Sequence, residues 1–277
     1  MILEPFDLRW PGLRLHGLHN LSAAEKRPTL VFLHYFGGAA RTWEPVLQAL
    51  GEDFGCVAVD LPGSGESRLE RVDDRCFVGS LLDATASAVG SLLGKVGAGD
   101  YVLVGHSMGG KVALALAASP GCPRGLRALA LVAPSPPTPE PMPEAERARL
   151  LAGQGSREAA RGTLEKITAK PLPEAWQAMA VEDQVRVTPA AWRSWLEYGS
   201  RVDIAGRMER IKAPVFLLAG GEDANLTPRV LRREIADRLP EEFAREPEVV
   251  PGAAHLLPLE APEAVADFVR RAAGHFL

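Results

Sequence analysis

The residue best placed for nucleophilic chemistry is Ser107, at the centre of the pentapeptide Gly105-His106-Ser107-Met108-Gly109. An apolar run precedes this pentapeptide and a segment rich in alanine and leucine follows it, which predicts a buried strand, a sharp turn and a helix. Glycine is required on both sides of such a turn because a Cβ atom there would collide with the strand or the helix. The spacing predicts a serine nucleophile; a glycine-rich turn with an incidental serine is the alternative.

The helix predicted after Ser107 would also supply electrostatics suited to acyl transfer. Backbone amides at the start of a helix lack intrahelical partners, and they favour the negative charge of a tetrahedral intermediate. We expect the amide of Met108 to be one donor to this oxyanion. A serine hydroxyl also needs a neighbouring base, and that base needs an acid partner that holds its tautomer.

The elements that must position these groups alternate along the chain. Short apolar runs, typical of strands covered on both faces, occur at residues 29–34, 56–59, 101–104, 126–132, 215–219 and 248–250. Segments of helical period separate most of them. This order predicts an α/β fold with a mostly parallel, doubly wound sheet, whose functional loops follow the carboxyl ends of the strands. Alternation near residues 13–18 predicts an antiparallel opening strand.

The alternating pattern is interrupted between residues 134 and 213. A proline-dense stretch opens this interval, and four segments of helical period follow before the next apolar run at Val215. We therefore expect a helical cap of residues 134–213 inserted into a core domain of residues 1–133 and 214–277. Trp176, Trp192 and Trp195 are candidates to wall an apolar substrate pocket, although each could instead pack the cap onto the core.

With these features the chain resembles the serine-nucleophile, esterase-like branch of the α/β-hydrolase superfamily over nearly its whole length. The LHYFGG segment at residues 33–38 matches the family loop that supplies a second oxyanion amide, which implies Phe36 as that donor. Tyr35 stands where the family commonly has glycine, and it could point its hydroxyl into the pocket or pack beside the turn. The segment VAVDLPGSGES at residues 57–67 matches a structural family turn, and we expect Asp60 to accept local amide bonds in a surface turn.

The resemblance also implies an acid and a base after the serine, in that order. Asp223 follows the apolar run at 215–219 as in the family's acid turn, and its neighbour Glu222 is the alternative. His255 follows a short strand and a glycine turn, as the family's catalytic histidine does. None of the other histidines follows both the serine and the acid on a strand-end loop; they are His16, His19, His34, His106 and His275. We expect His34 to be a hydrogen-bonded structural residue.

The resemblance implies a serine hydrolase that cleaves a carboxylic ester or thioester of a small molecule through an acyl-enzyme, with no metal and no organic cofactor. Serine in the nucleophile position disfavours the family's dehalogenase and epoxide hydrolase chemistries, which need a carboxylate there. One alternative is a carbon-carbon bond hydrolase or lyase; a dicarboxylate substrate would want Arg41, Arg193 or Arg201 facing the pocket. Another is a ligand-binding protein of the same fold with little turnover.

Composition excludes several other classes of protein. The 277 residues suffice for one large globular domain, and a net charge of −4 offers no basic field for nucleic acid. No apolar run approaches the roughly 18 residues of a membrane span, and no secretory signal opens the chain, so we expect a cytoplasmic location. Cys56, Cys76 and Cys122 form no CxxC pair, which disfavours a disulfide framework and a thiolate metal site. The oligomeric state is left open.

Overall fold

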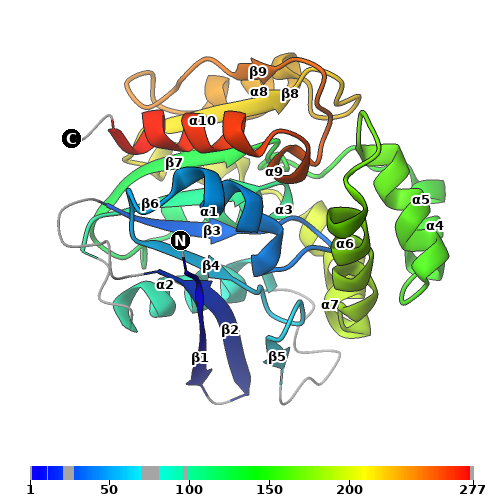
Figure 1. The fold of residues 1–277 in the computed structure, drawn as a ribbon. Coiled ribbons are helices and arrows are strands. Elements are labelled where there is room, and N and C mark those ends of the chain that lie inside the picture. The colour runs from blue at the N-terminus through cyan, green and yellow to red at the C-terminus, as the bar shows by residue number, and fades with distance from the viewer. Residues whose placement is uncertain (1, 11, 21–27, 70–80, 96–98, 275–277) are drawn as a thin grey trace.

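The sheet at the centre of the fold carries the residues singled out above. The computed structural model describes residues 2–10, 12–20, 28–69, 81–95 and 99–274 (Figure 1). Its nine described strands are β1 (Glu4–Trp10), β2 (Leu13–His19), β3 (Thr29–Leu33), β4 (Cys56–Val59), β5 (Arg68–Leu69), β6 (Tyr101–His106), β7 (Leu126–Val132), β8 (Val215–Gly220) and β9 (Glu248–Val250). They follow the order β1-β2-β4-β3-β6-β7-β8-β9, and β5 pairs with β2.

The pairing directions confirm the predicted mostly parallel sheet. From β4 to β9 every neighbouring pair is parallel; in β3, for example, Val31 lies opposite Val57 on one side and Leu103 on the other. Strands β3 and β4 are buried along their whole length, as their unbroken apolar sequences predict. The sheet opens with an antiparallel hairpin of β1 and β2, of which only the second strand was predicted.

Helices cover both faces of the sheet, so it is doubly wound as predicted (Figure 1). One face packs against α1 (Glu44–Leu50) and the C-terminal α10 (Pro262–Gly274), which buries Val265, Phe268 and Val269 toward the strands. The helices that build the other core cluster are α2 (Leu81–Lys95), α3 (Met108–Ala117) and α8 (Pro228–Glu234). The single-turn helix α9 (Leu257–Glu260) precedes α10.

The helical insertion between β7 and β8 lies together at one side of the sheet (Figure 1). Its four helices, called the cap helices below, are α4 (Glu144–Ala152), α5 (Arg157–Ile167), α6 (Glu174–Arg186) and α7 (Pro189–Glu197). Ser156 and Thr188 immediately precede α5 and α7, and the side chain of each accepts a hydrogen bond from a first-turn amide. Helix α6 runs to Arg186, five residues beyond the helical segment that the apolar pattern alone indicates at 174–181.

The strand order changes direction at β3 and β6. From β3 the sheet continues through β4 on one side and through β6 on the other. The loops after these two neighbouring strands therefore leave the sheet in diverging directions, and ligands of open α/β sheets bind at such a point. Phe36 follows β3 and Ser107 follows β6, so both lie at this point of the sheet.

The turn that follows β4 is buried, which corrects the expectation of a surface turn. Asp60 is 3% exposed and accepts hydrogen bonds from His16 Nδ1, the Glu66 amide and the more distant Ala40 amide. The start of α7 covers the turn, since the amide of Thr188 donates to Gly63 O and a Cβ at Gly63 would lie 2.5 Å from that of Ala191. The core residues around Asp60 and the start of α7 over Gly63 together bury the turn, and a local turn signature indicates neither.

Two of the three cysteines lie within the described residues. Cys56 is buried in β4 and Cys122 is partly buried, both as free thiols, while Cys76 and His275 lie outside the described part of the chain. In that part no helix is long and apolar enough to cross a membrane.

Candidate active site

Ser107 lies on the sharp turn between β6 and α3. Its φ of 52° places a non-glycine residue in the left-handed region, at the position immediately before α3. The two flanking glycines allow the turn: a Cβ at Gly105 would lie 2.7 Å from Gly109 O, and one at Gly109 would lie 2.2 Å from Leu33 O. The steric demand inferred from the sequence is therefore present in the structure.

A chain of hydrogen bonds joins Ser107 to the two downstream candidates. The Ser107 hydroxyl lies 3.0 Å from His255 Nε2, and His255 Nδ1 lies 2.8 Å from Asp223 Oδ2. A carboxylate can only accept, so the Nδ1 nitrogen carries the proton and Nε2 is left to accept from the serine. The structure thus brings together three side chains separated by up to 148 positions in the sequence.

The carboxylate of Asp223 is held by its backbone surroundings. Its Oδ1 atom accepts hydrogen bonds from the amides of Asn225 at 2.9 Å and Leu226 at 3.0 Å. Burial by itself would raise the pKa of Asp223, but the bonds from His255 and these two amides lower it to about 2. The side chain is consequently ionised at neutral pH. The alternative acid, Glu222, is exposed to solvent.

The loop that carries His255 is tied to both the core and the cap helices. The amide of His255 donates to Ile167 O at the end of α5, at 3.0 Å. The carboxylate of Glu260 in α9 accepts from the amides of Ala254 and Leu256, on either side of the histidine, and from Ala169 just after α5. No spacing in the sequence predicted this role for Glu260, because its partners are main-chain amides.

The two candidate oxyanion donors lie just after the ends of two neighbouring strands. Met108 is the first residue of α3, where its amide has no intrahelical acceptor, and Phe36 lies in the turn after β3. That turn is closed by a hydrogen bond from Gly38 N to Tyr35 O, and its left-handed residue is Gly37, with φ of 95°. A tyrosine is therefore tolerated at position 35.

His34 fixes the same turn from below. Its Nδ1 donates to Tyr35 O at 2.7 Å, and its Nε2 accepts from the amide of Leu61 at 3.0 Å. Burial lowers the pKa of His34, so the neutral tautomer that these bonds require is the stable one. The expectation of a hydrogen-bonded structural histidine is confirmed.

Tyr35 packs beside the turn instead of entering a cavity. It is 2% exposed, its ring centroid lies 5.2 Å from that of His106, and its ring occupies the space that a Cβ at Gly38 would need. Its hydroxyl has no hydrogen-bond partner among the described residues, and burial raises its pKa. The hydroxyl is therefore protonated at neutral pH.

An apolar cavity, partly open to solvent, lies beside the two oxyanion candidates. The core contributes the side chains of Phe36, Met108 and Val112 to its wall, and the cap side contributes Val187 and Trp195. Met108 and Val112 are one helical turn apart on α3, so the cavity extends along this helix away from Ser107. None of its lining residues carries a charge.

The tryptophans of the cap helices differ in their positions. Trp195 lines the cavity. Trp192 stacks on Phe36 with ring centroids 4.2 Å apart and donates from Nε1 to Leu150 O, so it packs behind the wall. Trp176 belongs to a separate cluster, packed against residues that include Tyr35. Composition identifies these aromatic residues, but only the tertiary packing shows which one faces the cavity.

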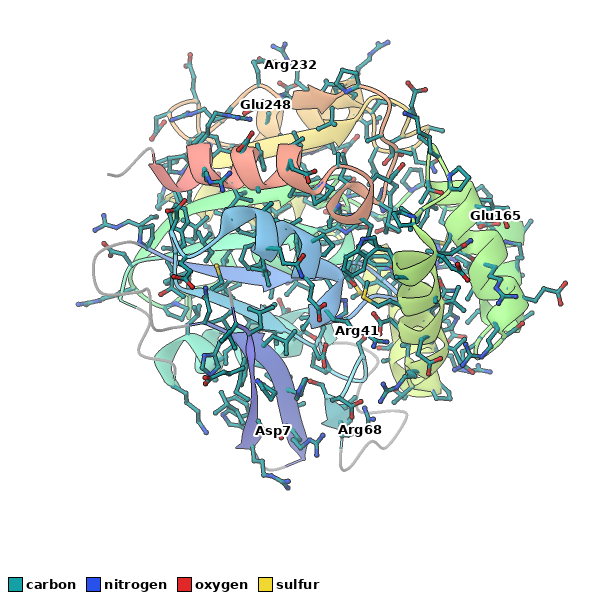
Figure 2. The ribbon with its side chains drawn as sticks, in the orientation of Figure 1. Asp7, Arg41, Arg68, Glu165, Arg232 and Glu248 are labelled. Atoms are coloured by element: carbon teal, nitrogen blue, oxygen red, sulfur yellow. The ribbon has the colours of Figure 1, made fainter. Side chains whose placement is uncertain are left out.

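The three arginines considered for a dicarboxylate substrate pair with acids elsewhere. Arg41 binds Asp183 in α6. Figure 2 shows Arg41 at the edge of the core next to α6. Arg193 pairs with Glu197 and Arg201 with Glu144, and both arginines are largely exposed. No arginine lines the apolar cavity. Within the described residues there is also no cluster of three histidine, cysteine or carboxylate side chains that could hold a metal ion.

Comparison with known proteins agrees with this geometry. The family model described as "Alpha/beta hydrolase family" matches residues 30–268. The chain belongs to the alpha/beta hydrolase family. This alpha/beta hydrolase is 32% identical over 246 residues to a 2-succinyl-6-hydroxy-2,4-cyclohexadiene-1-carboxylate synthase of Salmonella heidelberg (strain SL476), an alignment that covers 81% of this chain and 88% of the relative.

Solved structures share the fold of this alpha/beta hydrolase at lower identity. A putative aryl esterase from Burkholderia cenocepacia superposes with a TM-score of 0.81 at 20% identity, covering 98% of this chain and 100% of the other. A 2-hydroxy-6-oxo-6-phenylhexa-2,4-dienoate hydrolase from a Rhodococcus strain superposes with a TM-score of 0.77 at 23% identity, covering 98% and 99%. At these identities the likeness establishes the fold and leaves the substrate to the site itself.

Proposed function

We propose that this chain is a serine hydrolase that cleaves small-molecule carboxylic esters or thioesters with an apolar acyl group. The hydrogen-bonded series Ser107, His255 and Asp223 beside an uncharged cavity carries the proposal. The series supplies an activated nucleophile, and the cavity offers apolar surface with no cation that would favour an acidic substrate.

The proposed reaction proceeds by two acyl transfers. His255 Nε2 takes the proton of Ser107 as Oγ attacks the acyl carbon, and the amides of Met108 and Phe36 stabilise the oxyanion. The same nitrogen then returns the proton to the departing alcohol or thiol. Water, deprotonated by His255, attacks the acyl carbon; the bond to Ser107 Oγ breaks, Oγ takes the proton back from His255, and the acid is released. The ionised Asp223 stabilises the imidazolium in both steps.

The direct test uses Ser107→Ala and a series of p-nitrophenyl esters with acyl chains of two to twelve carbons. We expect kcat of the variant to fall by roughly 10⁴- to 10⁶-fold, as in other triads. A fluorophosphonate probe should label wild-type protein at Ser107 and leave the variant unlabelled. Equal hydrolysis by the two proteins would overturn the proposal, and a labelled protein that releases one equivalent of product and stops would indicate a binding protein.

A second candidate is the reaction of the Salmonella relative, favoured by 32% identity over 81% of this chain. The name of this relative specifies a product with a succinyl group and a ring carboxylate, hence with two negative charges. Their recognition would call for cationic side chains, whereas the cavity described above has none. Chromatographic assay for formation of this product separates the candidates: turnover at a rate above that of the best ester would place this reaction first.

A further inference from the structure

His106 is a buried residue for which the proposed reaction has so far given no role. It is the last residue of β6 and immediately precedes Ser107. Its side chain is completely buried, and its ring packs within 5.2 Å of the Tyr35 ring, 5.3 Å of the His255 ring and 6.1 Å of the Trp43 ring, measured between centroids.

One hydrogen bond distinguishes His106 from a packing residue. Its Nε2 lies 2.8 Å from the main-chain oxygen of His255, 149 positions away in the sequence. A carbonyl oxygen only accepts, so Nε2 carries a proton and donates it. Burial lowers the pKa of His106 well below 6.5, and the neighbouring His255 lowers it further, so the ring is neutral. The neutral ring has a single N–H, and the bond to His255 uses it.

This bond completes the restraint of His255 by both of its main-chain polar groups. The amide donates to Ile167 O on the cap side, and the carbonyl accepts from His106 on the core side. The imidazole itself reaches Asp223 through Nδ1 and Ser107 through Nε2. Because His106 and Ser107 are adjacent in the chain, a shift of this strand end would move the nucleophile and the support of its base together.

We propose that His106 is a positioning residue, which donates from Nε2 to the His255 carbonyl and so holds the imidazole of His255 within hydrogen-bond reach of Ser107. This inference rests on the proposed serine hydrolase activity. A ring at position 106 could fill the space without any polar atom, so the donor, and not the volume, is the property that the role requires.

Two variants of equal shape separate the donor from the volume. His106→Gln keeps an N–H donor on a flexible side chain, and His106→Met has nearly the same shape without a donor. We expect kcat for the preferred p-nitrophenyl ester to fall roughly 10- to 100-fold in H106M with KM within about twofold of wild type, because a small displacement of a catalytic group is costly. We expect kcat of H106Q to be at least about fivefold higher than kcat of H106M. If H106M fails to fold, H106F, which keeps an aromatic ring, takes its place in the comparison.

Trp43→Phe is the control for packing, since Trp43 borders His106 through its ring and leaves the His106 donor in place. We expect it to keep kcat within about twofold of wild type while its melting temperature falls, as for a reduced core side chain. Equal kcat values in H106Q and the donor-free variant, with wild type labelled by fluorophosphonate at Ser107, would overturn this inference alone. Failure of wild type to be labelled or to hydrolyse any ester would overturn the proposed function and this role with it.

Discussion

Ser107 occupies a left-handed backbone conformation, which a serine adopts only when the surrounding structure compels it. Here the compulsion comes from β6, which ends one residue earlier, and from α3, which begins one residue later. The result is a hydroxyl directed at His255 instead of a side chain packed into the core. At the residue scale the site therefore depends on strain at one residue and on the charge of another, Asp223, whose carboxylate pairs with the protonated nitrogen of the histidine.

Asp223→Asn tests the contribution of that charge. The amide keeps the shape of the side chain but can donate to His255 Nδ1, which would leave the proton on Nε2 and block the base. We expect kcat to fall by roughly 10⁴-fold with little change in KM, measured with the preferred ester. Glu222→Gln is the matched control at the adjacent, exposed position, and it should leave kcat unchanged. A reversed pattern would make Glu222 the acid.

The local strand-turn-helix pattern singled out Ser107, whereas Asp223 and His255 were named from the resemblance to the family, with Glu222 as the alternative acid. The sequence could not single out Glu260 or the bond from His106, since these side chains bind main-chain groups that the tertiary structure brings to them. The sequence could not predict that Trp195 lines the cavity either. The aromatic composition of the cap helices is compatible with several arrangements of the same side chains.

At the scale of elements, the sharp turn that carries Ser107 between β6 and α3, here called the elbow, depends on the close approach of α3 to β3 and β6. Strand patterns predicted this part of the fold well because buried parallel strands have short, unbroken apolar sequences. The cap helices were predicted as segments, but not the surface that they cover. Asp60 illustrates this limit, since its turn has a clear local signature and yet lies beneath α7.

Two glycine-to-alanine variants test the elbow against an ordinary helix. Gly109→Ala would place a Cβ 2.2 Å from Leu33 O, so we expect a loss of about 3 kcal/mol or more in the free energy of unfolding. Gly162 lies within α5 with open space around its Cβ position, and Gly162→Ala should gain about 0.5 to 1 kcal/mol. Urea denaturation measures both; a tolerated alanine at 109 would contradict the steric account of the elbow.

At the scale of the whole molecule, the cap helices contact the core through polar side chains as well as apolar ones. The apolar contact joins Phe36 to Trp192, and the polar contact joins Arg41 to Asp183 in α6. Arg186, at the end of the same helix, pairs with Glu66 of the core. The division of the chain into a core and a cap of residues 134–213 stays a prediction, and the Arg41–Asp183 pair is a place where their association can be measured.

The pH dependence of stability tests the contact between Arg41 and Asp183. Burial raises the pKa of Asp183 from 3.8 to about 6, and the bonds from Arg41 only partly oppose it. A raised carboxyl pKa means that the folded chain binds more protons than the unfolded chain between these values, so this group's contribution to stability falls as pH rises through about 6. The amide side chain in the Asp183→Asn variant does not titrate. The free energy of unfolding of this variant, minus that of wild type, should therefore increase by on the order of 1 kcal/mol from pH 5 to pH 7.5.

Urea denaturation of both proteins at the two pH values measures this difference. Glu182→Gln is the control, because Glu182 is the preceding residue of α6 and its carboxylate pairs with Arg157 at the surface. Exposed pairs contribute little to stability, so the difference between this variant and wild type should not change with pH. A difference for Asp183→Asn that shrinks toward pH 7.5 would mean that the pair with Arg41 outweighs the burial of the carboxylate. In that case the ion pair itself would hold α6 to the core, and protonation of Asp183 would weaken the contact between α6 and the core.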